Sequence, residues 1–253
     1  MEEPELLAKI KQKPELRGID DSVVSGSLNN YMKKHSLVLP KLKKSQIKII
    51  IKEIRAELRT LVGQFQKSKK RIEALSDFQE LLKTHLSTAE RLSFYPNIKN
   101  LFNKLRIKSV LDLGCGLNPI ALASPDFQYY ASDINLSDLK KVQDFFNKNN
   151  IKGKTFVCDL RNISSCPLPL ADITLLFKVL DIIEPKGHKL AEKIILHSNS
   201  KYILASFATR KLSGKPMNFP RRLWFEKMLS RLSLKFESFS SNNEIFYLIY
   251  NKK

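Results

Sequence analysis

The sequence is poor in cysteine and has no long hydrophobic run, and each shortage excludes a class of protein. Its three cysteines, at positions 115, 158 and 166, form no CxxC pair. An odd number without paired spacing argues against a disulfide scaffold and a zinc site, and it is typical of a reducing cytosol. No apolar run reaches the roughly 18 residues that a membrane span needs. We therefore expect a cytoplasmic protein with no membrane span and no metal site.

Acidic residues are scarce relative to basic ones. The 253 residues include 44 Lys and Arg but only 25 Asp and Glu, a net charge of +19. The excess is uneven, because residues 33–71 hold 13 basic and two acidic residues, a net charge of +11. With 43% hydrophobic residues the chain is able to bury a full core. This charge indicates a polyanionic partner, most often a nucleic acid.

The N-terminal part is predicted to be helical. Between Ile47 and Phe65, apolar residues recur at intervals of four and three, which is typical of one helix face. A neighbouring face carries a basic stripe, and a second basic run follows it. These residues are Lys48, Lys52, Arg55 and Arg59, then Lys69, Lys70 and Arg71. We predict a basic helical extension over residues 1–108 that docks on RNA, although an ordinary solvated helix face has the same pattern.

From Ser109 onward, short apolar runs alternate with helical stretches. This alternation predicts a doubly wound α/β domain over residues 109–253, with a mostly parallel seven-stranded sheet. The last two strands are joined by a short polar turn, which indicates a hairpin. The predicted strands are 109–113, 129–133, 155–159, 173–177, 202–207, 234–239 and 245–250.

Two glycines follow the first predicted strand, in the segment Val110 to Gly116. Small residues at the carboxyl end of a first strand let a ligand approach the backbone closely. The third glycine of the dinucleotide fingerprint is absent. Instead an acidic residue precedes the glycines, and an acidic residue ends each of the next two strands. These residues are Asp112, Asp133 and Asp159.

This constellation resembles the S-adenosylmethionine-dependent methyltransferases of Rossmann-like fold. Further motifs narrow the resemblance to the aminoglycoside-resistance 16S ribosomal RNA guanine-N7 methyltransferases, from about residue 75 to 250. These motifs are HLSTAER (85–91), LDLGCGLNP (111–119), LLFK (175–178), SFATRKLSGK (206–215), WFE (224–226) and NNEIFYLI (242–249).

The resemblance implies a set of cofactor-binding residues. Arg91 would pair with the carboxylate of the cofactor, as suits a guanidinium fork. Asp133 would accept hydrogen bonds from the ribose, and Asp159 with Leu160 would bind the adenine. The other implied residues are His85, Ser87, Thr88, Asp112, Gly114 and Gly116.

On the substrate side, the resemblance implies no proton-transfer residue. Lys178 either positions the substrate or forms an ion pair with Asp181 or Glu184. Trp224 or Phe207 would stack on a flipped base. Three basic residues after the fifth strand would contact RNA, namely Arg210, Lys211 and Lys215.

The implied partner is the small ribosomal subunit, bound by a monomer. Three alternatives stay open from the residues alone. The enzyme could methylate another base such as adenine N1, or a small molecule, although the basic segment argues against the latter. The chain could also be a non-catalytic ribosome-binding factor that kept the fold.

Overall fold

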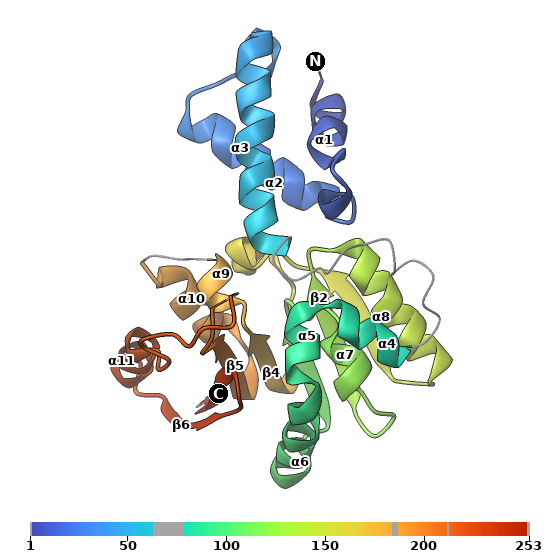
Figure 1. Ribbon diagram of the computed structural model, residues 1–253, viewed down its shortest axis with the longest axis vertical. Helices are drawn as coiled ribbons and strands as arrows, with labels where there is room; N and C mark the ends of the chain where they lie inside the picture. The colour runs from blue at the N-terminus through green and yellow to red at the C-terminus, as the bar shows by residue number, and fades with distance from the viewer. Residues whose placement is uncertain (1, 63–77, 184–186, 212, 252–253) are drawn as a thin grey trace.

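A small helical bundle stands on a larger α/β domain (Figure 1). The computed structural model describes residues 2–62, 78–183, 187–211 and 213–251. The bundle consists of α1 (Glu3–Lys11), α2 (Asp21–Lys34) and α3 (Lys44–Val62). Asp20 caps α2 by accepting a hydrogen bond from the Ser22 amide. Between α1 and α2 the chain forms the short helix η1 (Pro14–Leu16).

The long helix α3 is confirmed, but its buried face is centred on a different row of residues. Ile50, Ile54, Leu58 and Val62 are buried, while Ile47, Ile51 and Leu61 are only partly buried against the same core. Because α1 and α2 both pack on α3, the apolar face is wide enough to include both rows. Phe65 lies outside the described residues.

The predicted seven-stranded sheet is confirmed, and its strand order is β3-β2-β1-β4-β5-β7-β6. The first five strands are parallel, and β7 runs antiparallel to both of its neighbours. The strands are β1 (Ser109–Leu113), β2 (Gln128–Asp133), β3 (Gly153–Val157), β4 (Ala171–Phe177), β5 (Ser200–Ala208), β6 (Lys235–Ser240) and β7 (Glu244–Tyr250). The strand predicted to reach residue 159 ends at Val157, because Asp159 instead caps the short helix η5 (Leu160–Ser165).

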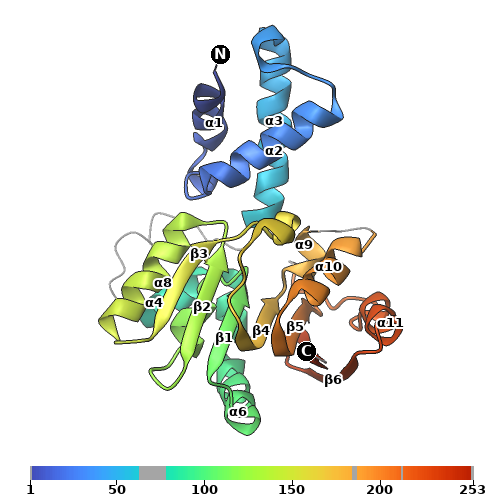
Figure 2. The ribbon, with the colours of Figure 1, turned by 180° about the vertical axis from the view of Figure 1, so that it is seen from behind.

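Helices cover both faces of the sheet, as Figures 1 and 2 show from opposite sides. One hydrophobic core joins the sheet to α4 (Phe78–Thr84), α6 (Tyr95–Leu105), α7 (Asn118–Leu122) and α8 (Leu136–Lys148). The other joins it to η5, α9 (Leu180–Ile183), α10 (Lys189–His197) and α11 (Leu223–Arg231). The short helix α5 (Leu86–Arg91) follows α4 directly.

The segment predicted as one extension, residues 1–108, has two parts with different packing. The bundle has a hydrophobic core of its own, which runs from Leu6 to Val62. By contrast, Leu81, Ile98 and Phe102 of α4 and α6 are buried in the core of the sheet. Within the described residues, no helix combines the length and apolarity needed to cross a membrane.

Candidate active site

A pocket lies at the carboxyl ends of the central strands, where the order reverses between β1 and β4. Doubly wound sheets bind ligands at this place. The pocket holds about 760 Å³, counting the solvent at its mouth. It is lined by eight of the predicted site residues: His85, Ser87, Gly114, Gly116, Asp133, Asp159, Leu160 and Lys178. Leu61 and Val62, at the end of α3, also line it, which the sequence did not indicate.

The glycine turn forms the floor of the pocket. Gly114 and Gly116 have φ angles of +69° and +49°, a region that favours glycine. A Cβ on Gly114 would lie 2.5 Å from Cγ1 of Val179, and one on Gly116 would lie 3.1 Å from Cε1 of His85. The backbone here is therefore open to a ligand only because both residues lack a side chain.

The ring of His85 lies against this turn and contacts two hydroxyl groups. Its Nδ1 lies 3.2 Å from the Ser87 hydroxyl and 3.1 Å from the Thr88 hydroxyl. Burial lowers the pKa of His85 to about 4. Thr88 is fully buried and does not line the pocket, so its contact with the site runs through His85.

Asp133 ends β2 and binds the glycine turn. Its Oδ2 accepts a hydrogen bond from the Gly116 amide at 2.9 Å, and its Oδ1 accepts one from the Asn135 amide at 3.0 Å. Each oxygen keeps a further lone pair for a ligand. Burial raises the pKa of Asp133 to about 6.

Asp112 lies behind the glycine turn and not in the pocket lining. Its Oδ2 accepts a hydrogen bond from the Tyr129 hydroxyl at 2.8 Å. Its buried Oδ1 has no hydrogen-bond partner among the described residues. Burial raises the pKa of Asp112 to about 7.

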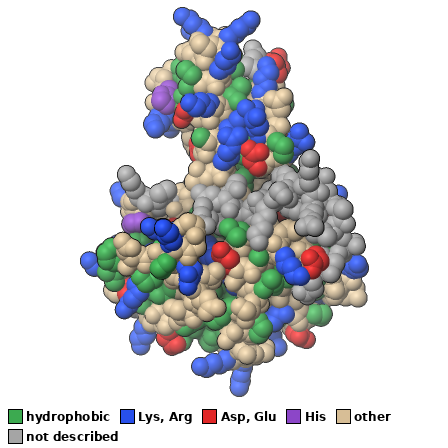
Figure 3. Space-filling model, in the orientation of Figure 1, with side chains coloured by type: hydrophobic (Ala, Val, Ile, Leu, Met, Phe, Trp, Pro, Cys, Tyr) green, Lys and Arg blue, Asp and Glu red, His purple; other side chains and the backbone are tan. Residues whose placement is uncertain are grey.

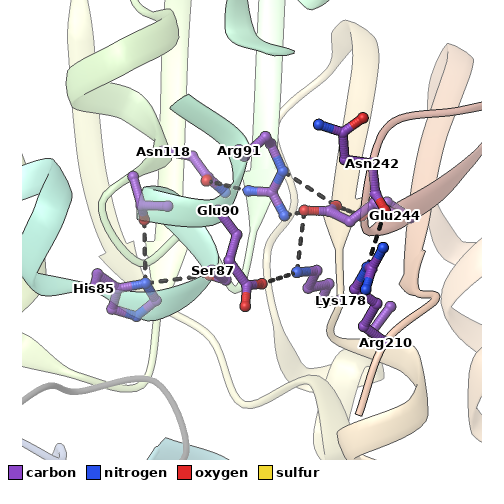
Figure 4. A network of polar contacts seen from close by, with 12 residues as sticks. His85, Ser87, Glu90, Arg91, Asn118, Lys178, Arg210, Asn242 and Glu244 are labelled. Atoms are coloured by element: carbon purple, nitrogen blue, oxygen red, sulfur yellow. Dashed lines mark hydrogen bonds and ion pairs between the residues drawn. The ribbon is translucent and has the colours of Figure 1, made fainter. Parts of the chain in front are cut away.

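Arg91 does not line the pocket and is bound by other protein groups (Figure 4). Its Nη2 lies 2.9 Å from Oε2 of Glu244, and its Nη1 donates to Oδ1 of Asn118 at 2.7 Å. Both ionic side chains are buried, with 1% and 0% of the side chain exposed. Burial alone would lower the pKa of Arg91, but the Glu244 carboxylate outweighs this effect and raises it. The geometry thus gives Arg91 an internal partner that the sequence did not indicate.

Lys178 lines the pocket and joins the same network. Its Nζ lies 2.6 Å from Oε2 of Glu90 and 3.2 Å from Oε1 of Glu244. The expected pairing with Asp181 is wrong, because Arg222 holds that carboxylate at 2.9 Å. Glu184 lies outside the described residues. Lys178 thus binds two carboxylates, and only that of Glu244 is shared with Arg91. Glu90 belongs to the motif HLSTAER and Glu244 to the motif NNEIFYLI.

The pocket wall next to Asp159 contains a disulfide between Cys158 and Cys166, with Cα atoms 5.7 Å apart. The cysteine spacing argued against a disulfide scaffold, and this single bond corrects that expectation locally. The bond joins the two ends of η5, because Cys158 lies two residues before this helix and Cys166 directly follows it. Cys115 is free and buried. In the described part of the chain, no group of three or more His, Cys, Asp or Glu is placed to hold a metal ion.

The two aromatic residues predicted to stack on a base are placed elsewhere. Phe207 is 1% exposed and belongs to the core of the sheet. Trp224 lies outside the pocket lining and stacks on His188, with ring centroids 3.8 Å apart. Neither ring therefore faces the pocket.

The predicted RNA-contact residues divide into exposed and engaged groups. Arg55 donates hydrogen bonds to the last carbonyl groups of α1, and Arg59 pairs with Glu15 at 2.8 Å. Helix ends attract such donors because their carbonyl groups lack helical partners. Arg210 is exposed, but its guanidinium donates to the backbone carbonyl groups of Gly214 at 3.1 Å and Asn242 at 3.4 Å. The other exposed residues of the set are Lys48, Lys52, Lys211 and Lys215. Lys69, Lys70 and Arg71 lie outside the described residues.

Known proteins share this architecture. The structure of the 16S rRNA methyltransferase RmtF in complex with S-adenosyl-L-homocysteine superposes with a TM-score of 0.79 over the full length of both chains, at 22% identity. The 16S rRNA methylase RmtB gives a TM-score of 0.78 at 22% identity, over 100% of this chain and 99% of that one. At this identity the likeness establishes the fold.

Curated relatives are also similar in sequence. A 16S rRNA (guanine(1405)-N(7))-methyltransferase of Micromonospora rosea is 29% identical over 182 residues, which are 67% of this chain and 64% of that protein. One of Serratia marcescens is 29% identical over 178 residues, 68% of this chain and 70% of that protein. The chain thus spans slightly less than two thirds of the Micromonospora relative.

The model of the ribosomal RNA methyltransferase (FmrO) family matches residues 52–247. The match runs from within α3 to β7, so it includes the pocket and the buried network beside it. The chain therefore belongs to the FmrO family of ribosomal RNA methyltransferases.

Proposed function

We propose that this protein transfers a methyl group from S-adenosylmethionine to N7 of a guanine in the decoding site of 16S rRNA, within the assembled small ribosomal subunit. The observation that carries the proposal is Asp133, whose carboxylate is anchored by the glycine turn and keeps acceptor capacity toward the pocket. The names of the curated relatives support the choice of base and RNA. Such an enzyme would work in the cytoplasm as a monomer and would confer resistance to aminoglycosides that bind this site.

The residues present fit an adenosyl cofactor. Asp133 would accept hydrogen bonds from the two ribose hydroxyls, and Asp159 and Leu160 would hold the adenine. Gly114 and Gly116 leave room for the methionine part. Asp112 lies outside the pocket lining, so its predicted part in cofactor binding would be indirect. Arg91 remains a predicted partner for the amino-acid carboxylate, and in that role it would have to be shared with Glu244.

The proposed reaction needs no general acid or base from the protein. When bound, S-adenosylmethionine supplies an electrophilic methyl group. Guanine N7 carries a free lone pair at neutral pH, so no proton has to be removed and no general base is needed. The residues around the pocket would instead position the two reactants and exclude water. Lys178 borders the pocket and is held in place by Glu90 and Glu244.

The target base has to leave its helix to reach the pocket. In A-form RNA, N7 faces a deep and narrow groove that side chains reach poorly. The loop between β5 and α11 offers an aromatic ring for this step, because Phe219 is 80% exposed. Exposed Lys211 and Lys215 lie on the same loop. Phe219 lies outside the lining of the pocket, as Trp224 and Phe207 do, but its ring is exposed, whereas Trp224 stacks on His188 and Phe207 is buried. We therefore propose that Phe219 stacks on the base.

Docking on RNA would be the task of the bundle. Lys and Arg side chains gather at the end of the bundle farthest from the sheet, where α3 begins (Figure 3). Lys43, Lys44 and Lys48 are exposed there. Phosphate contacts of this kind position a protein on RNA without reading its sequence. An assembled subunit, with its fixed RNA shape, is therefore the expected substrate.

Two variants test the proposal, one at the cofactor site and one at the RNA side. Calorimetry measures binding of S-adenosylhomocysteine, and methyl transfer is measured by incubating purified small subunits with methyl-labelled S-adenosylmethionine and each protein. Asp133→Ala should weaken binding of S-adenosylhomocysteine by about 10- to 100-fold, as expected for losing charge-assisted hydrogen bonds. Phe219→Ala should leave that binding unchanged and reduce methyl transfer. Wild-type protein that binds the cofactor but labels no subunit RNA would favour a non-catalytic ribosome-binding factor.

A further inference from the structure

The helical bundle is part of the pocket wall and not a separate appendage. Helix α3 runs from the bundle down to the α/β domain and ends beside α9 (Figure 1). Its last residues, Leu61 and Val62, line the pocket. The cofactor site that the sequence assigns to the α/β domain is thus completed by the domain assigned to RNA docking.

The bundle also holds the loop that follows Asp133. The Asp20 amide donates to the Ile134 carbonyl at 3.0 Å, and the Leu136 amide donates to the Gly18 carbonyl at 2.7 Å. A Cβ on Gly18 would lie 2.4 Å from Oδ1 of Asn135, so this close approach requires glycine. Ile134 and Asn135 themselves line the pocket.

A second link runs through Arg161, which binds the pocket and the bundle at once. Its Nη2 lies 2.6 Å from Oδ2 of Asp159, and its Nε lies 2.9 Å from Oδ1. Its Nη1 donates to the Ser27 hydroxyl of α2 at 3.1 Å and also to the Glu57 carboxylate of α3. Ser27 is fully buried, and the Arg161 side chain is 18% exposed. The guanidinium is therefore fixed from both sides.

This arrangement limits how Asp159 is able to accept a ligand. A carboxylate offers about four lone pairs. The Arg161 backbone amide takes one of them, at 3.0 Å from Oδ1. The guanidinium Nε–H, which is shared between both oxygens, and an Nη2–H take about two more. The direction of the remaining acceptor site depends on where Arg161 lies, and Ser27 and Glu57 determine that position.

We infer that Arg161 is a positioning residue through which the bundle orients Asp159 toward the adenine amine. The inference rests on the proposed function. If Arg161 has this role, the position of the bundle on the α/β domain and the affinity for the cofactor depend on each other. By linkage, an RNA that shifts the bundle changes cofactor affinity by the same factor as the cofactor changes RNA affinity.

The test compares two ligands that differ only at the adenine. Calorimetry with the full chain measures binding of S-adenosylhomocysteine and of its 6-oxo analogue, S-inosylhomocysteine. The wild-type protein should prefer the first ligand, because its 6-amine donates to Asp159 whereas the 6-oxo group repels the carboxylate. In Glu57→Gln this preference should fall by about tenfold, the usual effect of losing a charged hydrogen-bond partner. Arg161→Met should reduce it similarly from the pocket side.

Glu15→Gln is the matched control, because it breaks the ion pair with Arg59 inside the bundle. It should keep the wild-type preference. If Glu57→Gln and Arg161→Met lower both affinities equally and leave their ratio unchanged, Arg161 only holds the fold and the inference is overturned. A wild-type chain that binds neither ligand would overturn the proposed function, and the inference with it.

Discussion

Three carboxylates around the pocket are stabilised in three different ways. Backbone amides hold Asp133, a guanidinium holds Asp159, and a tyrosine hydroxyl holds one oxygen of Asp112. Of the three, only Asp112 leaves a buried oxygen without a hydrogen-bond partner among the described residues. Ionisation of Asp112 is therefore expected to lower the stability of the folded state.

Replacing Asp112 should make stability less dependent on pH. The folded pKa of about 7 lies above the ordinary aspartate value, so the folded chain keeps a proton that the unfolded chain releases. Asp112 therefore lowers the stability progressively as the pH rises from about 4 to about 7. Asp112→Asn lacks this cost. Its stability relative to wild type should increase by about 2.5 kcal/mol between pH 5 and pH 8 in urea unfolding. A difference that does not change with pH would contradict the raised pKa.

Loss of the buried ion pair between Arg91 and Glu244 should lower the stability of the fold, because each charge neutralises the other in the interior. Arg91→Ala would leave the Glu244 carboxylate buried with Lys178 as its remaining cation. Breaking a buried ion pair in this way costs about 3–5 kcal/mol. We expect the double variant Arg91→Met with Glu244→Gln to unfold at a higher denaturant concentration than Arg91→Ala. Wild-type stability in Arg91→Ala would show that the arginine is free to serve a ligand alone.

At the scale of elements, the sequence predicts strands and long helices well. β4 ends in a buried and mostly apolar run, residues 173–177, and the periodicity over α3 is that of a helix. The contacts between distant elements could not be predicted, because no local pattern records them. Arg91 meets Glu244 across 153 residues, and Arg161 meets Glu57 across 104. The motifs name these residues, but only the folded sheet brings them together.

The basic stripe of α3 illustrates the same limit. Helical spacing places four cations on one face, but the end of α1 and Glu15 engage Arg55 and Arg59. Lys48 and Lys52 remain exposed. Changing both to Ala should reduce the log–log salt slope of subunit binding by about two, since each phosphate contact contributes roughly 0.9 on duplex DNA.

A charge-matched control separates docking from net charge. Lys152 and Lys154 are exposed beside the start of β3, far along the chain from α3. Their double Ala variant has the same net charge and should keep the wild-type slope. Equal slopes for both variants and wild type would mean that the α3 stripe is only a solvated face.

At the scale of the whole molecule, two parts with separate cores share one pocket. The bundle has its own hydrophobic core, yet α3 ends in the pocket lining and Arg161 ties α2 and α3 to Asp159. Composition alone divides the chain into a basic docking part and a catalytic part. The structure makes these parts interdependent, so RNA docking and cofactor binding are expected to influence each other.

Mapping the methylated base tests the central claim most directly. Small subunits are treated with the protein and S-adenosylmethionine, and their 16S rRNA is then reduced with borohydride and cleaved with aniline, which breaks the chain at N7-methylguanosine. Primer extension locates the break. We predict one protein-dependent break, at a guanine of the decoding site. Methylation without aniline-sensitive cleavage, with primer extension stopping at an adenine instead, would contradict the assignment to guanine N7.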